Sequence, residues 1–253
     1  MTNLNLMIKR FMAGLRFGSG FTEKAKAACG LVYISRLSRL TFVMELFGKK
    51  QQVVLKTGSD AATFVEVFLE QEYALPENFK PKTIIDLGSN IGFASIYFNL
   101  RDPQASITAL EPDPSNLELL AANAGRTDAI KIIPAAIAAT AGTQIFYPRP
   151  QQGMSSSFIK HSMSKPISVI TYSLDSLLDF LKLPIVDLVK FDIEGAEWDV
   201  FSTADLKRIN NLIGEYHGDL TGRKVNEFIA LFPGFQSSIR KLSSNRSIIF
   251  LYR

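Results

Sequence analysis

One short segment of the chain combines an acid with two closely spaced glycines. Residues 83–92 read TIIDLGSNIG, an apolar run that leads into Asp86, Gly88 and Gly92. Glycine lets the backbone turn tightly after a strand and lets a ligand approach it closely. In an α/β sheet such a turn lies at the carboxyl ends of the strands, where nucleotides bind. The pattern therefore predicts a cofactor loop made of Asp86, Gly88, Ser89, Asn90 and Gly92.

The acid indicates which cofactor this loop would take. A dinucleotide places its pyrophosphate at the start of the following helix, and a carboxylate nearby would repel it. S-adenosylmethionine (SAM) has no phosphate and carries a cationic amine and a sulfonium, so Asp86 favours SAM over NAD. The spacing of Gly88 and Gly92 also departs from the G-x-G-x-x-G pattern of dinucleotide sites. The alternative is a tight turn that binds no ligand.

A second acid follows the next apolar run. Glu111 comes 23 residues after Gly88, directly after the segment ITAL at 107–110. An acid about 20 residues beyond the glycine turn can accept hydrogen bonds from both hydroxyls of a ribose. Taken alone, Glu111 could equally cap the next helix. Together with Asp86 and Gly88, it favours a ribose-binding role.

Charged residues also end the fourth predicted strand. In the segment KFDIEGAE at 190–197, Lys190, Asp192 and Glu194 alternate with apolar residues. This alternation places charge on one side of a strand that is expected to be buried, and buried charges must be paired or functional. We predict Lys190 and Asp192 as active-site residues, with Asp192 where cofactor and substrate meet. The alternative is an ion pair from Lys190 to Asp192 or Glu194.

Glu215 and His217 end the fifth predicted strand and share one of its faces. Histidine can act as a base near neutral pH. His217 is therefore the first candidate for a general base, with Asp192 next and Glu215 beside them. The alternative is a histidine with a structural role. We assign no metal ligand from the sequence, although Asp192, Glu194 and Glu215 are hard oxygen ligands that do not exclude a metal.

Strands and helices alternate from residue 82 onward. Strands are expected over 83–87, 107–110, 130–133 (to 137 in one interpretation), 186–191 and 212–216, with helices at 91–100, from Pro114, and at 222–231. This order predicts an α/β fold with a doubly wound, mostly parallel sheet. Strands at 235–241 and 246–252 are joined by so short a link that they should form an antiparallel hairpin. Such a sheet is typical of class I, Rossmann-like methyltransferases.

Residues 1–80 are predicted to form an N-terminal extension, or cap, on a SAM-binding domain at 81–253. The extension should contain helices within 1–40, a hairpin at 41–57 and a helix at 60–74 with Asp60 as its N-cap. Seven basic side chains and one acid, Glu23, give residues 1–40 a net charge of +6. This segment could contact a membrane surface or an anionic substrate, or could be a solvated cap. Without an aromatic-interleaved basic groove, no nucleic acid is expected.

The composition sets further limits. The chain carries a net charge of +4, and its one cysteine, Cys29, cannot form an internal disulfide. No apolar run is long enough to span a membrane, and no apolar stretch typical of a cleaved signal follows the basic N-terminal residues. These features favour a cytoplasmic protein, for which a homodimer is one option.

The motifs together resemble the FkbM family of SAM-dependent methyltransferases. The resemblance covers about residues 57–218 and rests on TGSDAATFVEVFLEQEY, IIDLGSNIGFAS, LEPDPSNLELLAAN, PAAI, VDLVKFDIEGAEWDVF and EYH. The family's cofactor loop matches Asp86, Gly88, Asn90 and Gly92, and many members carry alanine where Ser89 stands. Its ribose-binding acid matches Glu111, and Pro112 and Ala136 lie in matching segments expected at the cofactor. Its later motifs match Asp192, Glu194, Glu215 and His217.

The resemblance implies methyl transfer from SAM, commonly to an oxygen of a sugar, glycolipid or secondary metabolite. We therefore predict O-methylation of a small-molecule or glycan acceptor, walled in by the N-terminal extension and residues 143–172. N-methylation of an amine or a protein side chain is the alternative within enzymes. A SAM-binding partner protein without turnover is the alternative from another class, and an NAD-dependent oxidoreductase is less favoured than either.

Overall fold

The computed structural model describes residues 3–148, 157–160 and 165–253. At its centre is a seven-stranded sheet of order β11-β12-β10-β9-β3-β4-β5. The strands from β5 to β10 pair in parallel, while β12 runs antiparallel to both β10 and β11. This confirms the predicted mostly parallel sheet and its antiparallel hairpin. The strands are β3 (Thr83–Leu87), β4 (Ser106–Leu110), β5 (Ile130–Ile133), β9 (Leu188–Phe191), β10 (Asn211–His217), β11 (Gln236–Lys241) and β12 (Arg246–Tyr252).

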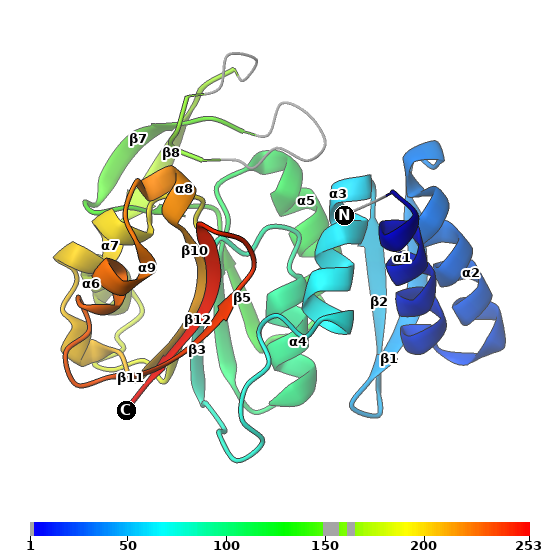
Figure 1. Cartoon of the computed structure of the whole chain (residues 1–253), viewed down its shortest axis with the longest axis horizontal. Coiled ribbons are helices and arrows are strands. Elements are labelled where there is room, and N and C mark those ends of the chain that lie inside the picture. The colour runs from blue at the N-terminus through cyan, green and yellow to red at the C-terminus, as the bar shows by residue number, and fades with distance from the viewer. Residues whose placement is uncertain (1–2, 149–156, 161–164) are drawn as a thin grey trace.

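Helices cover both faces of this sheet, as a doubly wound fold requires (Figure 1). One face carries α4 (Phe93–Arg101) and α5 (Pro114–Ala124), and the other carries α6 (Leu174–Phe180), α7 (Glu197–Thr203) and α9 (Val225–Ile229). The short α8 (Gly218–Thr221) follows β10. Neighbouring residues of β3 enter opposite cores, Ile84 the first and Ile85 the second, because side chains alternate along a strand. Both faces are thereby buried.

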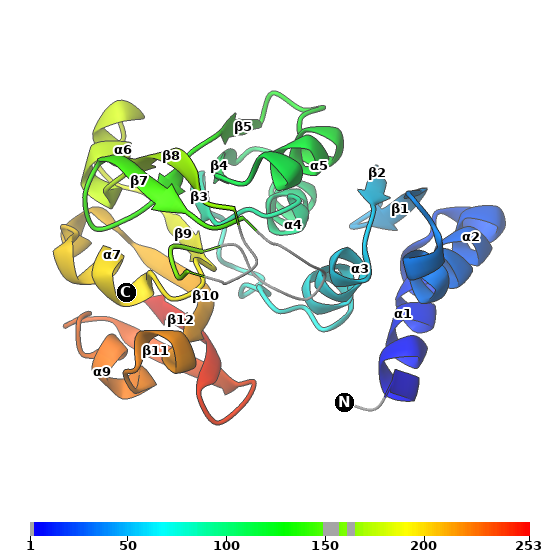
Figure 2. The ribbon, with the colours of Figure 1, turned by 90° about the horizontal axis from the view of Figure 1, so that it is seen from above.

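Residues 3–69 add two more layers outside α4 and α5 (Figures 1 and 2). They comprise α1 (Asn3–Phe17), α2 (Gly20–Tyr33), a 3-10 turn (Ile34–Arg36), the hairpin β1 (Leu40–Leu46) and β2 (Lys49–Leu55), α3 (Gly58–Phe64) and a π-helical turn (Val65–Leu69).

The extension and the sheet domain share one continuous apolar core. Phe64 of α3 packs edge-on against Phe93 of α4, with ring centroids 5.6 Å apart. The side chain of Asn123 on α5 also pairs with the backbone of β2, accepting from the Val54 amide at 2.7 Å and donating to the Val54 carbonyl at 3.0 Å. The extension is therefore fixed directly to the helices behind the cofactor loop. Among the described residues, no helix is long and apolar enough to cross a bilayer.

Several predicted boundaries are wrong, each for a local reason. Thr57, and not Asp60, is the N-cap of α3, because its Oγ1 accepts the Asp60 amide while Asp60 accepts the Thr57 amide in return. The helix predicted over 60–74 ends at Leu69 as the π-helical turn. The helix predicted over 222–231 is only α9 (Val225–Ile229), because Gly222, at φ +69°, is the C-cap of the preceding α8.

Two predicted strands are also shorter than expected. The strand at 130–133 does not continue to residue 137, because Pro134 has no amide to donate to the sheet. The next residues form β6 (Ala136–Ile137), which joins β7 (Gly142–Phe146) and β8 (Ile167–Tyr172) in a separate three-stranded sheet. The strand predicted from 186 begins at Leu188, and Val186 only bridges to Ile209.

Candidate active site

The glycine loop, which follows a strand and precedes a helix as predicted, lies between β3 and α4 and against the end of β9. Gly88 has a φ of +72°, and a Cβ atom there would lie 2.0 Å from the carbonyl oxygen of Asp192. Gly92 has a φ of +92°, and its Cβ would meet the side chain of Leu120 at 2.6 Å. Both positions therefore exclude larger side chains, and Gly88 brings the cofactor loop into contact with the strand that carries Asp192.

Asp86 lies beneath this loop and does not reach the cavity in front of it. Its carboxylate is fully buried, with Oδ1 3.0 Å from Nζ of Lys190 and Oδ2 accepting from Oγ of Ser95 at 2.6 Å. Lys190 also donates to the carbonyl of Gly88 at 2.9 Å. The partner of Lys190 is thus Asp86 and not Asp192 or Glu194. The two residues hold the loop from below, so Asp86 would act on a cofactor through Lys190 and the loop backbone.

Glu111 is tied to the same loop from the end of β4. Its Oε2 accepts from the Asn90 amide at 2.9 Å, and its Oε1 accepts from the Asp113 amide at 2.9 Å. The side chain is buried, and burial raises the pKa of Glu111 to about 7, against the lowering effect of these hydrogen bonds. Oε1 also accepts from Nδ2 of Asn116 at 3.3 Å, so it is Oε2 that keeps a lone pair to accept from a ribose hydroxyl.

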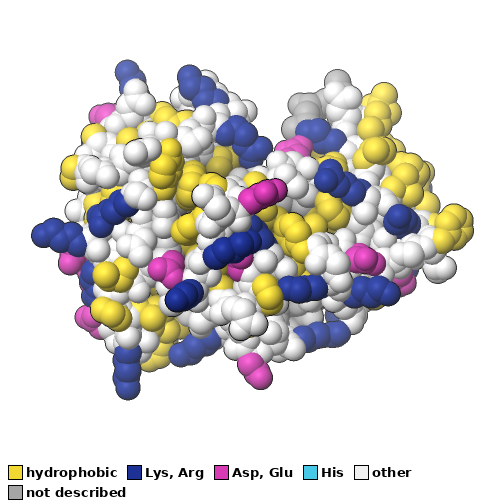
Figure 3. All heavy atoms as spheres, turned by 90° about the horizontal axis from the view of Figure 1, so that it is seen from below, with side chains coloured by type: hydrophobic (Ala, Val, Ile, Leu, Met, Phe, Trp, Pro, Cys, Tyr) yellow, Lys and Arg dark blue, Asp and Glu magenta, His cyan; other side chains and the backbone are white. Residues whose placement is uncertain are grey.

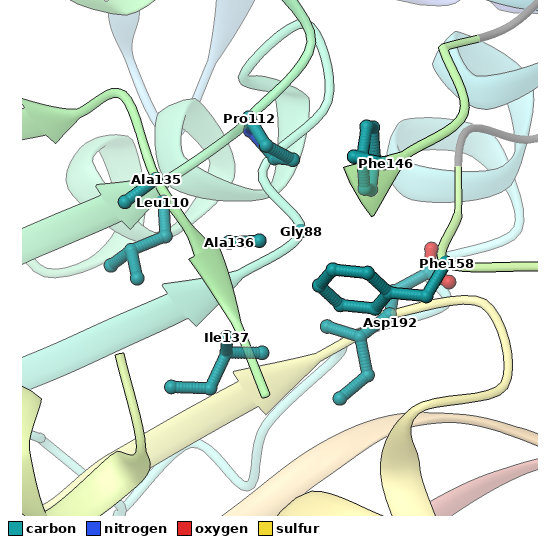
Figure 4. Close-up of a pocket in the computed structure, with 10 residues that line it drawn as sticks. Gly88, Leu110, Pro112, Ala135, Ala136, Ile137, Phe146, Phe158 and Asp192 are labelled. Atoms are coloured by element: carbon teal, nitrogen blue, oxygen red, sulfur yellow. The ribbon is translucent and has the colours of Figure 1, made fainter. Parts of the chain in front are cut away.

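A cavity opens between the ends of the central strands and the small sheet (Figure 4). It encloses about 350 Å³ of space that opens to solvent. Four predicted site residues line it: Gly88, Pro112, Ala136 and Asp192. Ser89, Asn90, Gly92 and Glu111 lie behind it as parts of the loop and its support.

Two phenylalanines complete the wall of this cavity and were not predicted. Phe146 of β7 and Phe158 pack edge-on, with ring centroids 5.5 Å apart, opposite Leu110, Ala135 and Ile137 (Figure 4). Such an apolar slot suits a flat aromatic base. Residues 143–172 were predicted to wall in the acceptor. In the described parts of that segment, Phe146 and Phe158 face the cofactor cavity, and 149–156 and 161–164 lie outside the described residues.

Next to this cavity, four carboxylates surround one buried histidine. Nδ1 of His217 lies 2.7 Å from Oε1 of Glu197, and Nε2 lies 3.3 Å from Glu194, 3.7 Å from Glu215 and 3.8 Å from Asp192. Glu215 and His217 do share a face of β10, as predicted. Glu197, at the start of α7, was not predicted, because nothing in the sequence indicates that this helix packs its first residue under β10.

The charges of this cluster shift the pKa of its members. Burial alone would lower the pKa of His217. The hydrogen bond to Glu197 and the negative charges of Asp192, Glu197 and Glu194 outweigh this effect, and the pKa of His217 is raised to about 10. Burial and the charge of Asp192 raise the pKa of Glu215 to about 7. The imidazole is therefore the positive centre of an acidic group.

The N-terminal extension contributes to this cluster as well. The hydroxyl of Tyr73 donates to Oδ2 of Asp192 at 3.2 Å, and Tyr73 is buried. Burial, with the charge of Asp192, raises the pKa of Glu72 to about 8 and that of Glu66 to about 7. These residues precede the first central strand, so no strand-end pattern could have indicated them.

A glycine loop, a buried acid at the end of the next strand and a cavity at the carboxyl ends of a doubly wound sheet with an antiparallel strand define a class I methyltransferase. The family model described as the methyltransferase FkbM domain matches residues 86–238. The chain belongs to this family, which confirms the resemblance seen in its motifs. Membership implies SAM as the methyl donor.

Named relatives include three methyltransferases. The methyltransferase sdnD of Sordaria araneosa is 26% identical over 56% of this chain and 68% of its own length. The hexuronic acid methyltransferase AglP of Haloferax volcanii is 27% identical over 62% of this chain and 64% of its own. The 2-O-methyltransferase NoeI of Sinorhizobium fredii is 30% identical over 47% and 56%. The matched segment thus spans between 56% and 68% of these relatives.

Solved structures of methyltransferases are similar to part of this chain at low sequence identity. The O-methyltransferase from Bacillus cereus in complex with SAH has a TM-score of 0.43 and 13% identity, over 68% of this chain and 74% of that one. The precorrin-6y C5,15-methyltransferase from Geobacter metallireducens has a TM-score of 0.45 and 15% identity, over 74% and 86%.

Proposed function

We propose that this methyltransferase transfers a methyl group from SAM to a hydroxyl of a sugar, glycolipid or secondary metabolite. The observation that carries the proposal is the position of Asp192. Its carbonyl oxygen lies 2.0 Å from where a Cβ of Gly88 would be, and its side chain faces both the cavity and the His217 cluster. Asp192 therefore lies between the cavity proposed for the methyl donor and a group of carboxylates that can accept a proton.

The residues around the cavity fit SAM. Pro112, Ala136, Phe146 and Phe158 offer an apolar slot for the adenine, and Glu111 lies behind it as an acceptor for the ribose. The carboxylates beside the cavity favour a cationic ligand and disfavour a pyrophosphate. When bound, SAM supplies an electrophilic methyl group and a thioether leaving group, so catalysis depends largely on aligning the acceptor.

A hydroxyl acceptor needs a base as its proton leaves, and the cluster provides candidates. The sequence indicates His217 first and Asp192 second. The structure favours Asp192, because it lines the cavity and its Oδ1 accepts no hydrogen bond among the described residues. His217 is fully buried between carboxylates, and its contribution is to hold them in place and balance their charge.

The same cluster argues against an amine acceptor. Carboxylates at this density favour the ammonium form of a nearby amine, which has no lone pair to attack a methyl group. A neutral hydroxyl is not disabled in this way. The names of AglP and NoeI, a hexuronic acid methyltransferase and a 2-O-methyltransferase, support an oxygen on a carbohydrate as the acceptor class.

The test is a SAM-dependent screen of glycans and small hydroxylated metabolites, with mass detection of the methylated product. We expect Asp192→Asn to lower turnover by about 10²-fold or more, the usual scale for a lost base. We expect His217→Ala to lower turnover as well, because the carboxylates around it would no longer be held in place. Both variants should still bind S-adenosylhomocysteine (SAH). Glu118→Gln, at an exposed carboxylate that pairs with Lys56, is the control and should turn over as the wild type does.

The outcomes separate this proposal from its alternatives. Turnover of amines but not hydroxyls, unchanged in His217→Ala, would identify an N-methyltransferase. Full SAH affinity without turnover on any acceptor would identify a SAM-binding partner protein. Tight binding of NAD would revive an oxidoreductase.

A further inference from the structure

One nitrogen of the His217 cluster faces only oxygen atoms. His217 is fully buried, and neither its Nε2 nor Oδ1 of Asp192 makes a hydrogen bond among the described residues. We propose that Nε2 of His217, Oδ1 of Asp192 and Oε2 of Glu194 form a divalent cation site. The role of this site rests on the proposed function, because the cation would hold the acceptor oxygen beside the cofactor.

The spacing of the three atoms fits one ion. They lie within 4.8 Å of one another, with Nε2 3.3 Å from Glu194 and 3.8 Å from Asp192. Two ligands bound at about 2.1 Å and at right angles are about 3 Å apart, and wider angles separate them further. Small side-chain adjustments would therefore complete the coordination.

The other nitrogen of His217 supports this assignment. Oε1 of Glu197 lies 2.7 Å from Nδ1, so Nδ1 donates to a buried carboxylate. A histidine that binds a metal commonly donates its second N–H to a carboxylate, which fixes the tautomer and orients the ring. In that tautomer the Nε2 lone pair points at carboxylate oxygens, an arrangement that is repulsive unless a positive charge lies between them.

The nearby cationic side chains have other partners. Lys190 pairs with Asp86 at 3.0 Å, and Arg246 pairs with Asp219 at 3.1 Å and with Glu215, which is not one of the three ligands, at 3.7 Å. The positive charge at Nε2 is thus either a proton on the histidine or a metal ion. Two carboxylates with one imidazole suit Mn²⁺, Mg²⁺ or Zn²⁺.

The ion would activate the weakly nucleophilic hydroxyl of the acceptor in two ways. A bound hydroxyl loses its proton more readily, and an open coordination position would orient the oxygen. Because Oδ1 of Asp192 would then bind the ion, the proton would pass in its place to Glu215, which lies 3.7 Å from Nε2 of His217 and is not assigned as a ligand. The C–O bond would form as the methyl–sulfur bond breaks, and the thioether would keep the electron pair.

Titration of metal-free protein with Mn²⁺, followed by EPR, tests the site without SAM or acceptor. We expect one strong site in the wild type and in Glu118→Gln, and at least about tenfold weaker binding in His217→Ala and Asp192→Asn. SAH affinity shows that each variant is folded. Free Mn²⁺ throughout the wild-type titration, or unchanged binding in His217→Ala, would overturn the site. If Mn²⁺ binds but no hydroxyl is methylated, the proposed function fails while the site stands.

A separate observation concerns the outer surface of α1, where apolar side chains face outward. Yellow side chains gather along the edge formed by α1 and α2 (Figure 3). Leu4 is 65% exposed and Ile8 52%, while the polar Lys9 and Arg10 turn inward to Glu70 and the Gly58 carbonyl. The exposed apolar positions recur every three or four residues, which makes one continuous stripe: Leu4, Met7, Ile8, Phe11, Met12 and Leu15.

The exposed charges of residues 1–40 are of one sign. Arg16 on α1, Lys24 and Lys26 on α2, and Arg36 and Arg39 beyond it are exposed. Glu23, the one acid of residues 1–40, is partly buried and accepts from the Val43 amide. Phe21, at the start of α2, is 90% exposed.

We propose that this face, the α1 stripe with Phe21 and the cations, docks on a bilayer that contains anionic lipids. An interfacial helix buries its apolar side at the acyl boundary while its cations contact the anionic headgroups. A second copy of the chain fits less well, because a symmetric contact would bring the same cations together.

Vesicle sedimentation tests this surface. We expect the protein to pellet with phosphatidylcholine vesicles that contain phosphatidylserine and to stay in solution with phosphatidylcholine alone. Leu4→Ser/Ile8→Ser/Phe11→Ser should abolish pelleting, and Ile145→Ser/Ile170→Ser, two exposed apolar residues of the small sheet, should not. No pelleting by the wild type, or pelleting retained by the α1 variant, would overturn the proposal. A dimer in light scattering that the α1 variant abolishes, without vesicle binding, would assign the stripe to a second copy.

Discussion

Nζ of Lys190 lies 3.0 Å from Oδ1 of Asp86, and both side chains are almost entirely buried beneath the cofactor loop. The two residues stand opposite each other on neighbouring parallel strands, β9 and β3. Because the same Nζ donates to the carbonyl of Gly88, this ion pair fixes the position of the loop relative to the sheet. The charge pair is thus part of the scaffold of the cofactor site.

Breaking this pair should lower both stability and cofactor affinity. Removing one partner of a buried ion pair leaves the other charge uncompensated, which costs about 3–5 kcal/mol. We expect Asp86→Asn and Lys190→Met each to destabilise the protein by that order and to weaken SAH binding. The measurements are urea unfolding and calorimetry, combined in a double-mutant cycle. Additive losses in the cycle would show that the pair does not act as a unit.

Gly88→Ala tests the close approach between the cofactor loop and β9. The substitution adds a Cβ 2.0 Å from the Asp192 carbonyl at a φ of +72°. Gly48→Ala is a matched control, because Gly48 has a φ of +70° and a Cβ added there would have no atom within 4 Å. The left-handed backbone alone costs about 1–2 kcal/mol. We expect only Gly88→Ala to abolish SAH binding by calorimetry, and equal binding by both variants would contradict the close contact.

The positions of the glycine loop and of Glu111 could be predicted because their signals are local. Gly88 follows a strand within a few residues, and Glu111 ends the next one. The partner of Lys190 could not be predicted in the same way. Sequence spacing offered Asp192 and Glu194, both within four residues of Lys190, whereas Asp86 is brought opposite Lys190 only by the order and register of the strands. That information is held in the packing of the whole sheet.

The members of the His217 cluster were even harder to predict from the sequence. Period-two alternation placed Glu215 and His217 on one face, and the structure agrees. Glu197 and Tyr73 reach the cluster from a helix start and from the N-terminal extension. Neither follows a strand-end pattern. The two phenylalanines of the cavity wall lie in and after β7, a strand whose segment has no clear periodicity.

Cofactor affinity should depend on pH through Glu111. Burial raises the pKa of this carboxyl to about 7, so it binds a proton more readily in the folded protein than in the unfolded chain. Ribose hydroxyls donate hydrogen bonds, so they favour the carboxylate, and affinity should fall as the pH drops through 7. Between pH 8 and pH 6 the carboxylate fraction falls about tenfold, and SAH affinity should fall by a similar factor. Calorimetry at the two pH values measures this change.

Glu111→Gln is the control for that pH dependence. The amide has nearly the shape of the acid and does not titrate, so its SAH affinity should be weaker than that of the wild type at pH 8 and flat between the two values. The raised pKa of Glu111 also makes the stability of the fold depend on pH. A carboxyl whose pKa is raised on folding contributes most stability at low pH and loses it as the pH rises toward 7. A wild-type SAH affinity that rises as the pH falls would contradict the ribose role.

Glu197→Gln should separate positioning of His217 from cofactor binding. Glu197 is fully buried, and its Oε1 lies 2.7 Å from Nδ1 of His217. The glutamine oxygen can still accept from Nδ1, so the ring keeps its place while the carboxylate charge is lost. Changing the residue that hydrogen-bonds the second ring nitrogen of an active-site histidine typically lowers activity or metal affinity by about 10- to 100-fold. We expect kcat to fall on that scale, with KM for the methyl acceptor and SAH affinity little changed.

Glu197→Ala removes the hydrogen-bond acceptor as well and should also destabilise the fold, since a buried Nδ1–H would lose its partner at a cost of about 1–3 kcal/mol. A wild-type kcat in Glu197→Gln would show that the imidazole needs only a hydrogen-bond acceptor and not a charge behind it.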